Sequence, residues 1–103
     1  MNIIIINTGG QVFQTNETTL SAIPDTYFID MLKTKPYADG SYFIDRNKAI
    51  FEEILDFLRD GSIYIPEDTR DILKLKQEAL FYKLHTIVQQ CDQALQAKQN
   101  VIL

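Results

Sequence analysis

The sequence predicts an α+β domain, in which a small mixed β-sheet is flanked by a cluster of about five short helices. Three observations support this prediction. The chain has 103 residues, of which 46% are hydrophobic and 23% charged, as expected for one globular domain with its own core. Strand-like residues gather before residue 16, and apolar residues at helical spacing dominate after residue 48.

A β-hairpin is predicted at the beginning of the chain. Residues 2–7 are mostly β-branched and apolar, and residues 12–15 continue with a strand-like pattern. Gly9 and Gly10 lie between them, and two glycines readily adopt the backbone angles of a two-residue hairpin turn. The first two strands are therefore expected to be antiparallel neighbours.

Several short elements are expected after the hairpin. Thr18 or Thr19 can cap a helix that runs through Ile23, because a threonine hydroxyl accepts a hydrogen bond from a free N–H of the first turn. Pro24 interrupts this helix. The next expected elements are a second short helix from residue 25 or 26, a loop at 35–41 and a strand at 42–45.

The most regular helix is predicted at residues 48–60. Its apolar residues form a broad face, Asn47 is a good N-cap, and Gly61 stands where a C-cap glycine belongs. The elements expected after it are a strand at 63–65 that Pro66 ends, helical residues at 67–76 and 77–84, and a last helix from Thr86. The apolar residues 101–103 have no obvious core to join.

Charge and composition argue against several classes of function. The net charge is −4, and residues 52–72 alone carry seven acidic residues and two arginines. Lysine and arginine do not cluster, so no nucleic-acid partner is expected. The longest aliphatic run has four residues, far short of the roughly 20 that span a bilayer, so no membrane association is expected. Cys91 is the only cysteine, and with no signal-peptide pattern this predicts a cytoplasmic location, with the nucleus as the alternative.

The nucleophilic and titratable residues do not predict a catalytic or metal site. His85 is the only histidine and is interpreted as a packed or helix-capping residue at the junction of two helices. Glu52 and Glu53 point about 100° apart on a helix, which favours a solvated face over an acid–base pair. His85 and Cys91 would point about 240° apart on one helix, and zinc needs more ligands than these two. We therefore predict no enzyme activity, no cofactor and no metal, with Cys91 as a small core residue.

The loop at 35–41 carries the strongest interaction signal. Tyr37 lies two residues before Asp39, between Pro36 and Gly40. An exposed aromatic side chain on a loop can anchor a partner. The alternative is that Tyr37 folds back onto its own domain.

Spaced blocks of residues resemble a known family. The quoted blocks are residues 6–13 (Ile-Asn-Thr-Gly-Gly-Gln-Val-Phe), 39–46 (Asp-Gly-Ser-Tyr-Phe-Ile-Asp-Arg) and 78–84 (Glu-Ala-Leu-Phe-Tyr-Lys-Leu), with Thr15, Thr19, Leu20, Pro24, Phe51, Ile54, Leu55, Phe57, Leu58, Arg59, Gly61 and Pro66 between them. Over residues 3–91 this order resembles the BTB/POZ domains of potassium-channel tetramerisation type, and is closest to the KCTD group. We accordingly assign residues 1–92 to a BTB/POZ domain and 93–103 to a C-terminal helical tail.

The resemblance implies a non-catalytic protein-interaction module that associates with copies of itself. KCTD proteins are typically pentamers, and many are adaptors for cullin-3 ubiquitin ligases, so a pentamer and cullin-3 are the implied partners. The apolar-x-acidic element of cullin docking is similar to Tyr37 and Asp39. Two alternatives stay open: the cytoplasmic assembly domain of a potassium channel, and an oligomerisation domain that has lost cullin binding.

The resemblance also suggests interface residues. It places the contact between copies at Asp45, Arg46 and Asp60, and the alternative is that Asp45 and Arg46 cap a strand-to-helix junction within one chain. Some channel members of the family bind zinc between subunits. The matching positions here are Tyr64, Arg70, Cys91 and Asp92, and since one of these four residues matches the zinc ligands, no zinc site is implied.

Overall fold

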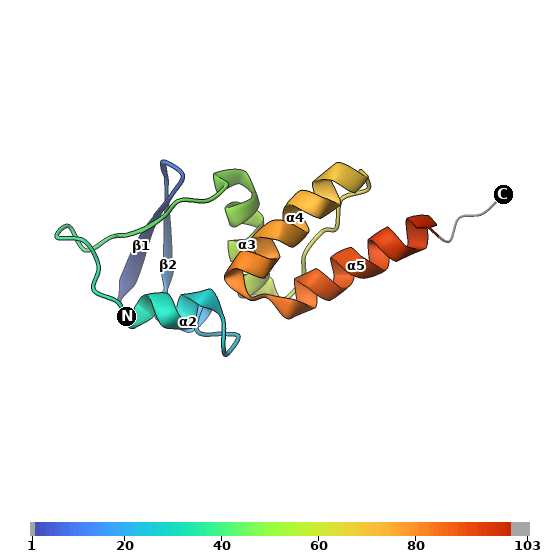
Figure 1. Cartoon of the computed structure of the whole chain (residues 1–103). Coiled ribbons are helices and arrows are strands. Elements are labelled where there is room, and N and C mark those ends of the chain that lie inside the picture. The colour runs from blue at the N-terminus through green and yellow to red at the C-terminus, as the bar shows by residue number, and fades with distance from the viewer. Residues whose placement is uncertain (1, 100–103) are drawn as a thin grey trace.

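A computed structural model describes residues 2–99 and shows a three-stranded mixed sheet with five helices, in agreement with the predicted α+β class. The molecule is elongated, with extents of 58 × 25 × 19 Å. The sheet lies at one end, and the last helix runs out towards the other (Figure 1). Within the described residues, no helix is both long enough and apolar enough to cross a membrane.

The predicted hairpin forms the centre and one edge of the sheet. β1 (Ile3–Thr8) pairs antiparallel with β2 (Gln11–Asn16) and parallel with β3 (Tyr42–Ile44), which gives the order β2-β1-β3. Successive side chains of a strand point to opposite faces. Ile6, Phe13 and Ile44 face the core and are buried, whereas Val12 and Phe43 lie on the other face and are exposed.

The turn between β1 and β2 depends on its glycines. Both have positive φ angles, 56° at Gly9 and 98° at Gly10. The Asn7 side chain accepts a hydrogen bond from the Gly10 N–H at 2.9 Å, and the Gly9 N–H donates to the Ile44 carbonyl at 3.1 Å. The turn therefore also joins the hairpin to β3.

The five helices are α1 (Glu17–Leu20), α2 (Tyr27–Leu32), α3 (Lys48–Asp60), α4 (Thr69–Tyr82) and α5 (His85–Gln99). Asn47 caps α3 by accepting from the Ile50 N–H, and Gly61 ends it with a left-handed φ of 82°, both as predicted. Asp68 caps α4 in the same way.

The core is built around aromatic rings between the sheet and the helices. Phe28 of α2 stacks on Tyr82 of α4 with ring centroids 5.1 Å apart, and Phe51 of α3 contacts both rings. All three side chains are fully buried. Aromatic side chains bury large areas each, so this cluster holds α2, α3 and α4 together.

Several predicted boundaries were wrong. Asn16, not Thr18 or Thr19, caps the first helix, which ends at Leu20 rather than Ile23. The residues expected to be helical over 67–84 form one helix at 69–82, and the last helix begins at His85 instead of Thr86. At α1 and α4 a capping side chain, Asn16 or Asp68, marks where the helix begins, rather than the apolar spacing.

The strand predicted at 63–65 does not form. This segment is extended and irregular between α3 and α4. Its side chains alternate as in a strand, but it lies beside none of the three strands of the sheet. The prediction for residues 101–103 concerns residues outside the described part of the chain.

Candidate interaction surfaces

The residues considered for catalysis or metal binding do not form a shared site. His85 is exposed at the first position of α5, so it is not a packed residue. Cys91 is fully buried, as predicted, and burial raises the pKa of its thiol, which makes the thiolate scarce at neutral pH. Across residues 2–99, no three His, Cys, Asp or Glu side chains gather as metal ligands do.

The loop between α2 and β3 holds Tyr37 in an exposed position. The Tyr37 N–H donates to the Ser41 carbonyl at 2.9 Å, and the Gly40 N–H donates to the Tyr37 carbonyl at 2.8 Å. The Tyr37 side chain is 62% exposed. The side chain therefore does not fold back into the core, and the turn holds the backbone of the loop without covering the ring.

Asp39 shapes this same loop. Its carboxylate accepts hydrogen bonds from the Ser41 N–H at 3.0 Å and from the Ser41 hydroxyl at 2.7 Å. These bonds stabilise the charged form and hold the pKa of Asp39 below its ordinary value. At neutral pH the loop thus presents an aromatic ring and a negative charge two residues apart.

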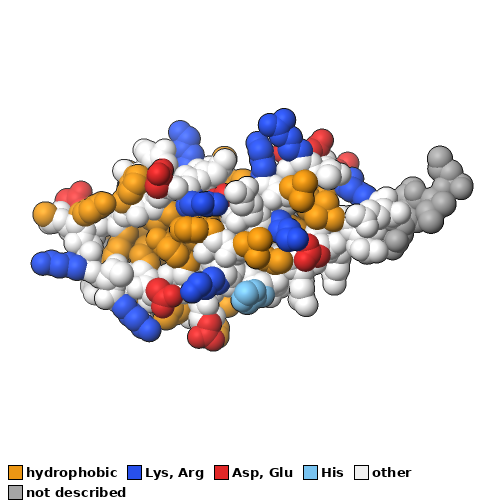
Figure 2. Space-filling model, in the orientation of Figure 1, with side chains coloured by type: hydrophobic (Ala, Val, Ile, Leu, Met, Phe, Trp, Pro, Cys, Tyr) orange, Lys and Arg blue, Asp and Glu red, His pale blue; other side chains and the backbone are white. Residues whose placement is uncertain are grey.

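A groove of about 290 Å³ adjoins the loop. One wall is α2, with Tyr27 and Met31, and the other is the start of β3, with Tyr42 and Phe43. Tyr37 also lines it. On the face drawn in Figure 2, hydrophobic side chains gather over the sheet end of the molecule, with Lys and Arg side chains at the margin.

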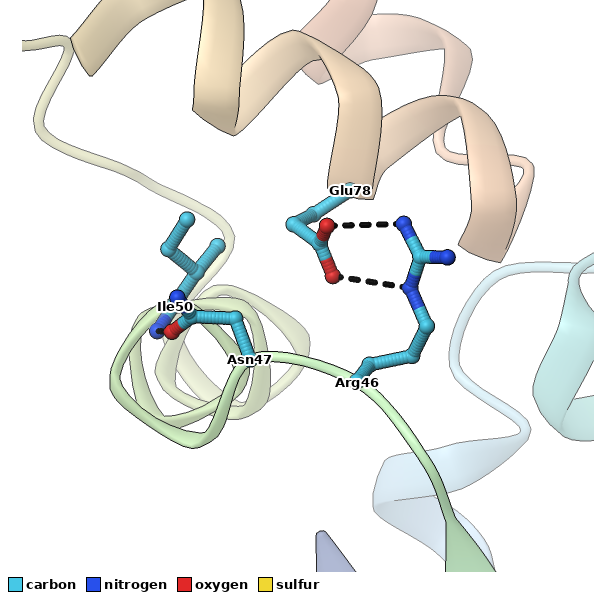
Figure 3. A network of polar contacts seen from close by, with 4 residues as sticks. All are labelled: Arg46, Asn47, Ile50 and Glu78. Atoms are coloured by element: carbon cyan, nitrogen blue, oxygen red, sulfur yellow. Dashed lines mark hydrogen bonds and ion pairs between the residues drawn. The ribbon is translucent and has the colours of Figure 1, made fainter. Parts of the chain in front are cut away.

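The Arg46 side chain is mostly buried and is paired within its own chain. Its Nε and Nη2 donate to the two oxygens of Glu78 at 3.1 and 2.7 Å (Figure 3). Its guanidinium also stacks over the Phe81 ring, 4.4 Å from the ring centroid. The hydrogen bond with Glu78 raises the pKa of Arg46 above its ordinary value. Arg46 therefore ties the β3–α3 junction to α4.

The other two predicted interface residues lie on different parts of the surface. Asp45 is exposed directly after β3 and close enough to Arg46 to favour its charged form. Asp60 is exposed at the last position of α3. The alternative of a strand-to-helix cap by Asp45 and Arg46 is not what is observed, because Asn47 supplies that cap (Figure 3).

Sequence reasoning missed two exposed aromatic side chains. Phe43 is 45% exposed on the outer face of β3, and Tyr64 is 71% exposed in the segment between α3 and α4. Strand-like alternation was visible at both positions. It did not indicate which face of each segment would stay uncovered, because that depends on elements distant in the sequence.

Comparison with known proteins identifies the family of this chain. The family model of the BTB/POZ domain matches residues 4–91 of this chain. The chain belongs to the BTB/POZ family. It is of the potassium-channel tetramerisation type and is KCTD-like, as the sequence blocks predicted.

The relatives of this BTB/POZ domain carry two kinds of name. A potassium channel regulatory protein of Mus musculus is 34% identical over 99% of this chain, and one of Bos taurus is 39% identical over 88%. The BTB/POZ domain-containing protein KCTD21 of Homo sapiens is 35% identical over 93% of the chain. This chain spans 40%, 36% and 37% of the length of these three relatives.

Proposed function

We propose that this BTB/POZ domain is a non-catalytic module that assembles with copies of itself, five copies being favoured, and serves as an adaptor or scaffold for a cullin-3 ubiquitin ligase in the cytoplasm. The observation that carries the proposal is the match of residues 4–91 to the BTB/POZ family, together with the KCTD-like relatives. In this proposal the self-associating domain comprises residues 1–92, and residues 93–103 extend it as a helical tail.

Cullin docking is assigned to Tyr37 and Asp39. Both are exposed, and hydrogen bonds within residues 37–41 hold their loop in one shape. A loop that is already held in one shape loses less conformational entropy on binding, and an exposed aromatic side chain on it can anchor an interface. The groove beside Tyr37 offers apolar surface for a partner side chain.

The native mass tests self-association. Light scattering on a sizing column at several concentrations should give the mass of five chains. Four chains would instead support the channel-type assembly, and one chain at all concentrations would contradict the proposal. Variants of Asp45 and Asp60 that reverse the charge should lower the mass, because both carboxylates are assigned to the contact between copies.

A pull-down with purified cullin-3 tests the docking assignment. Tyr37→Ala should abolish binding, and Asp39→Asn should weaken it while keeping the turn, since the amide oxygen can still accept from Ser41. Leu73→Ala is a matched control, because Leu73 is 51% exposed on α4, away from the loop. Equal binding by the parent and both loop variants would remove Tyr37 and Asp39 from the proposed docking site.

The names of the relatives favour a second candidate, the control of potassium-channel assembly. Two of them are named potassium channel regulatory proteins. Such control would follow if this domain joined mixed rings with the assembly domain of a channel. Co-purification of the two tagged domains would support it, and strict self-sorting into separate homo-oligomers would exclude it.

A further inference from the structure

A groove of about 350 Å³ lies between the start of α4 and the end of α5. Its apolar walls are Leu73 of α4, which is 51% exposed, and Leu95 of α5, which is half-buried. An ion pair of 2.7 Å between Lys76 and Asp92 joins the same two helices. Aliphatic surface that is open to water favours burial against other apolar groups, so the groove offers a packing site for one more apolar segment.

The chain leaves α5 at this groove. Lys98 and Gln99, the last residues of α5, line it together with Thr69 of α4. Residues 100–103 follow directly with the sequence Asn-Val-Ile-Leu, so three of the four are aliphatic. Four extended residues span up to about 13 Å, whereas the axes of two packed helices lie about 8–10 Å apart. The segment is therefore long enough to cross from α5 to α4.

The end of α4 shows how a helix of this chain turns back. Lys83 follows the last helical residue with a left-handed φ of 60°. The N–H of Leu84 then donates to the Ala79 carbonyl at 2.9 Å, and the Leu84 side chain is buried. A left-handed residue followed by a buried apolar residue thus satisfies a carbonyl of the last turn that has no donor within the helix.

The same order of residue types follows α5. Asn100 has the place after α5 that Lys83 has after α4, and the next residue is again aliphatic. Asparagine adopts the left-handed conformation more readily than most residues other than glycine. The apolar residue of such a turn commonly contacts an apolar side chain in the last two turns of its own helix. For Val101 that side chain is Leu95.

We propose that the chain turns back at Asn100 and that residues 101–103 close the groove between α4 and α5 of their own chain. The helix of the C-terminal tail ends where this turn begins. Val101 packs on Leu95, and the two residues after it pack on Leu73. The segment ties the end of α5 to the start of α4, so a partner that docks in the groove must first displace it. This inference does not depend on self-association, because every contact lies within one chain.

A tryptophan reporter tests the closure, since the chain contains no tryptophan of its own. In Leu73→Trp the indole lies on the wall of the groove, and residues 101–103 should shield its fluorescence from acrylamide. Serine at all three positions (Val101→Ser, Ile102→Ser and Leu103→Ser together) should increase quenching and shift the emission to the red. Leu80→Trp is the matched control, because Leu80 is also exposed on α4, at 54%, but does not line the groove. The serines should leave its quenching unchanged.

The concentration dependence identifies the occupant of the groove. Shielding by the same chain stays constant on dilution. Shielding that is lost on dilution would assign the groove to a second copy and overturn the proposal. Equal quenching of Leu73→Trp with and without the three serines would overturn it as well.

Amide hydrogen exchange on the unmodified protein gives a second readout that leaves the groove intact. The Val101 amide should be protected in the way the Leu84 amide is, because both donate to a carbonyl of the preceding helix. Exchange at Val101 as fast as in an unfolded peptide would contradict the turn at Asn100.

Discussion

Arg46 and Glu78, 32 residues apart in sequence, form the most completely satisfied polar pair in the described structure. Their side chains are 25% and 10% exposed, so water screens them less than it does the surface pairs. Two parallel hydrogen bonds and the stacking on Phe81 hold the guanidinium in one orientation. A residue expected at the contact between copies thus has a defined task inside the chain.

Removal of Glu78 should destabilise the fold more than removal of a surface carboxylate. We expect Glu78→Ala to lower the free energy of unfolding by about 2 kcal/mol, because it leaves a mostly buried guanidinium without its acceptor. Asp56→Ala is the control, since it breaks the exposed pair with Arg59 and should cost less than about 1 kcal/mol. Urea unfolding of both variants measures the difference, and equal losses would contradict the intrachain role.

Tyr82 buries a hydroxyl that has no hydrogen-bond partner among the described residues. Burial, followed by the negative charge of Glu78, raises the pKa of Tyr82 well above its ordinary value. The folded state therefore keeps this phenol neutral, whereas the unfolded chain ionises near pH 10. Above that pH the unfolded state binds fewer protons, so this group lowers stability as the pH rises.

Tyr82→Phe should remove this loss. At pH 7 the free energy of unfolding should be equal or higher by up to about 1 kcal/mol, because the variant no longer buries an unsatisfied hydroxyl. Between pH 9 and 11, a range that brackets the unfolded tyrosine pKa of about 10, the urea midpoint should fall less in the variant than in the parent. Cys91 titrates in both proteins and cancels in the comparison. If the urea midpoints of the two proteins fell equally with rising pH, the buried Tyr82 hydroxyl would not be the cause of the loss.

At the scale of elements, the hairpin turn is coupled to the junction between β3 and α3. A Cβ atom placed on Gly9 would lie 2.6 Å from the Arg46 carbonyl oxygen, a backbone atom. Nothing lies within 4 Å of the same position on Gly61, although its φ of 82° is also left-handed. The two glycines therefore separate the effect of backbone angle from that of close approach.

Gly9→Ala should consequently cost more than Gly61→Ala. The latter places an L side chain at a left-handed φ with open space around it, a backbone strain of about 1 kcal/mol. The former must also move a neighbouring backbone, and we expect a loss of more than about 2 kcal/mol. Thermal unfolding of the two variants, measured side by side, compares their losses of stability. A larger loss in Gly61→Ala than in Gly9→Ala would contradict this prediction.

The segment at 63–65 was predicted to be a strand because of its local side-chain pattern. Its alternation of half-buried isoleucines and an exposed tyrosine is that of a strand. Strand character also requires a neighbour for the backbone groups, and the α3–α4 connection has none beside it in the described chain. Side-chain pattern is local, whereas strand pairing is a long-range property.

At the scale of the whole molecule, the protomer is more extended than a compact domain of its length. Its radius of gyration is 15.0 Å, against about 13 Å for a typical domain of 100 residues. α5 packs mainly on α4 and buries only Ile87 and Cys91 fully. An elongated protomer of this kind presents much surface for assembly.

Self-association should make the melting temperature depend on concentration. Assembly adds mass-action stabilisation to the folded state, so a tenfold dilution should lower the melting temperature while the native mass falls. Circular dichroism melts at a series of concentrations measure this. A melting temperature that stays constant, with the mass of one chain throughout, is the contrary outcome.

Much of this protein could be predicted from sequence because the signals are local. The Gly9-Gly10 turn, the Asn47 cap and the Gly61 stop each act within a few residues of themselves. The apolar spacing of residues 48–60 likewise determined which face of α3 is buried. The spaced blocks over residues 3–91 were sufficient for the family.

The sequence by itself thus determined the α+β class and the family, whereas the structure decided that Tyr37 is exposed rather than folded back onto its domain. The tertiary structure alone decided that Arg46 pairs with Glu78, that β3 keeps a free edge beside α2, and that residues 62–66 lie unpaired beyond α3. Caps, turns and amphipathic faces are set by neighbours in the chain. Ion pairs and strand edges depend on packing between segments that are tens of residues apart, and no local pattern specifies that packing.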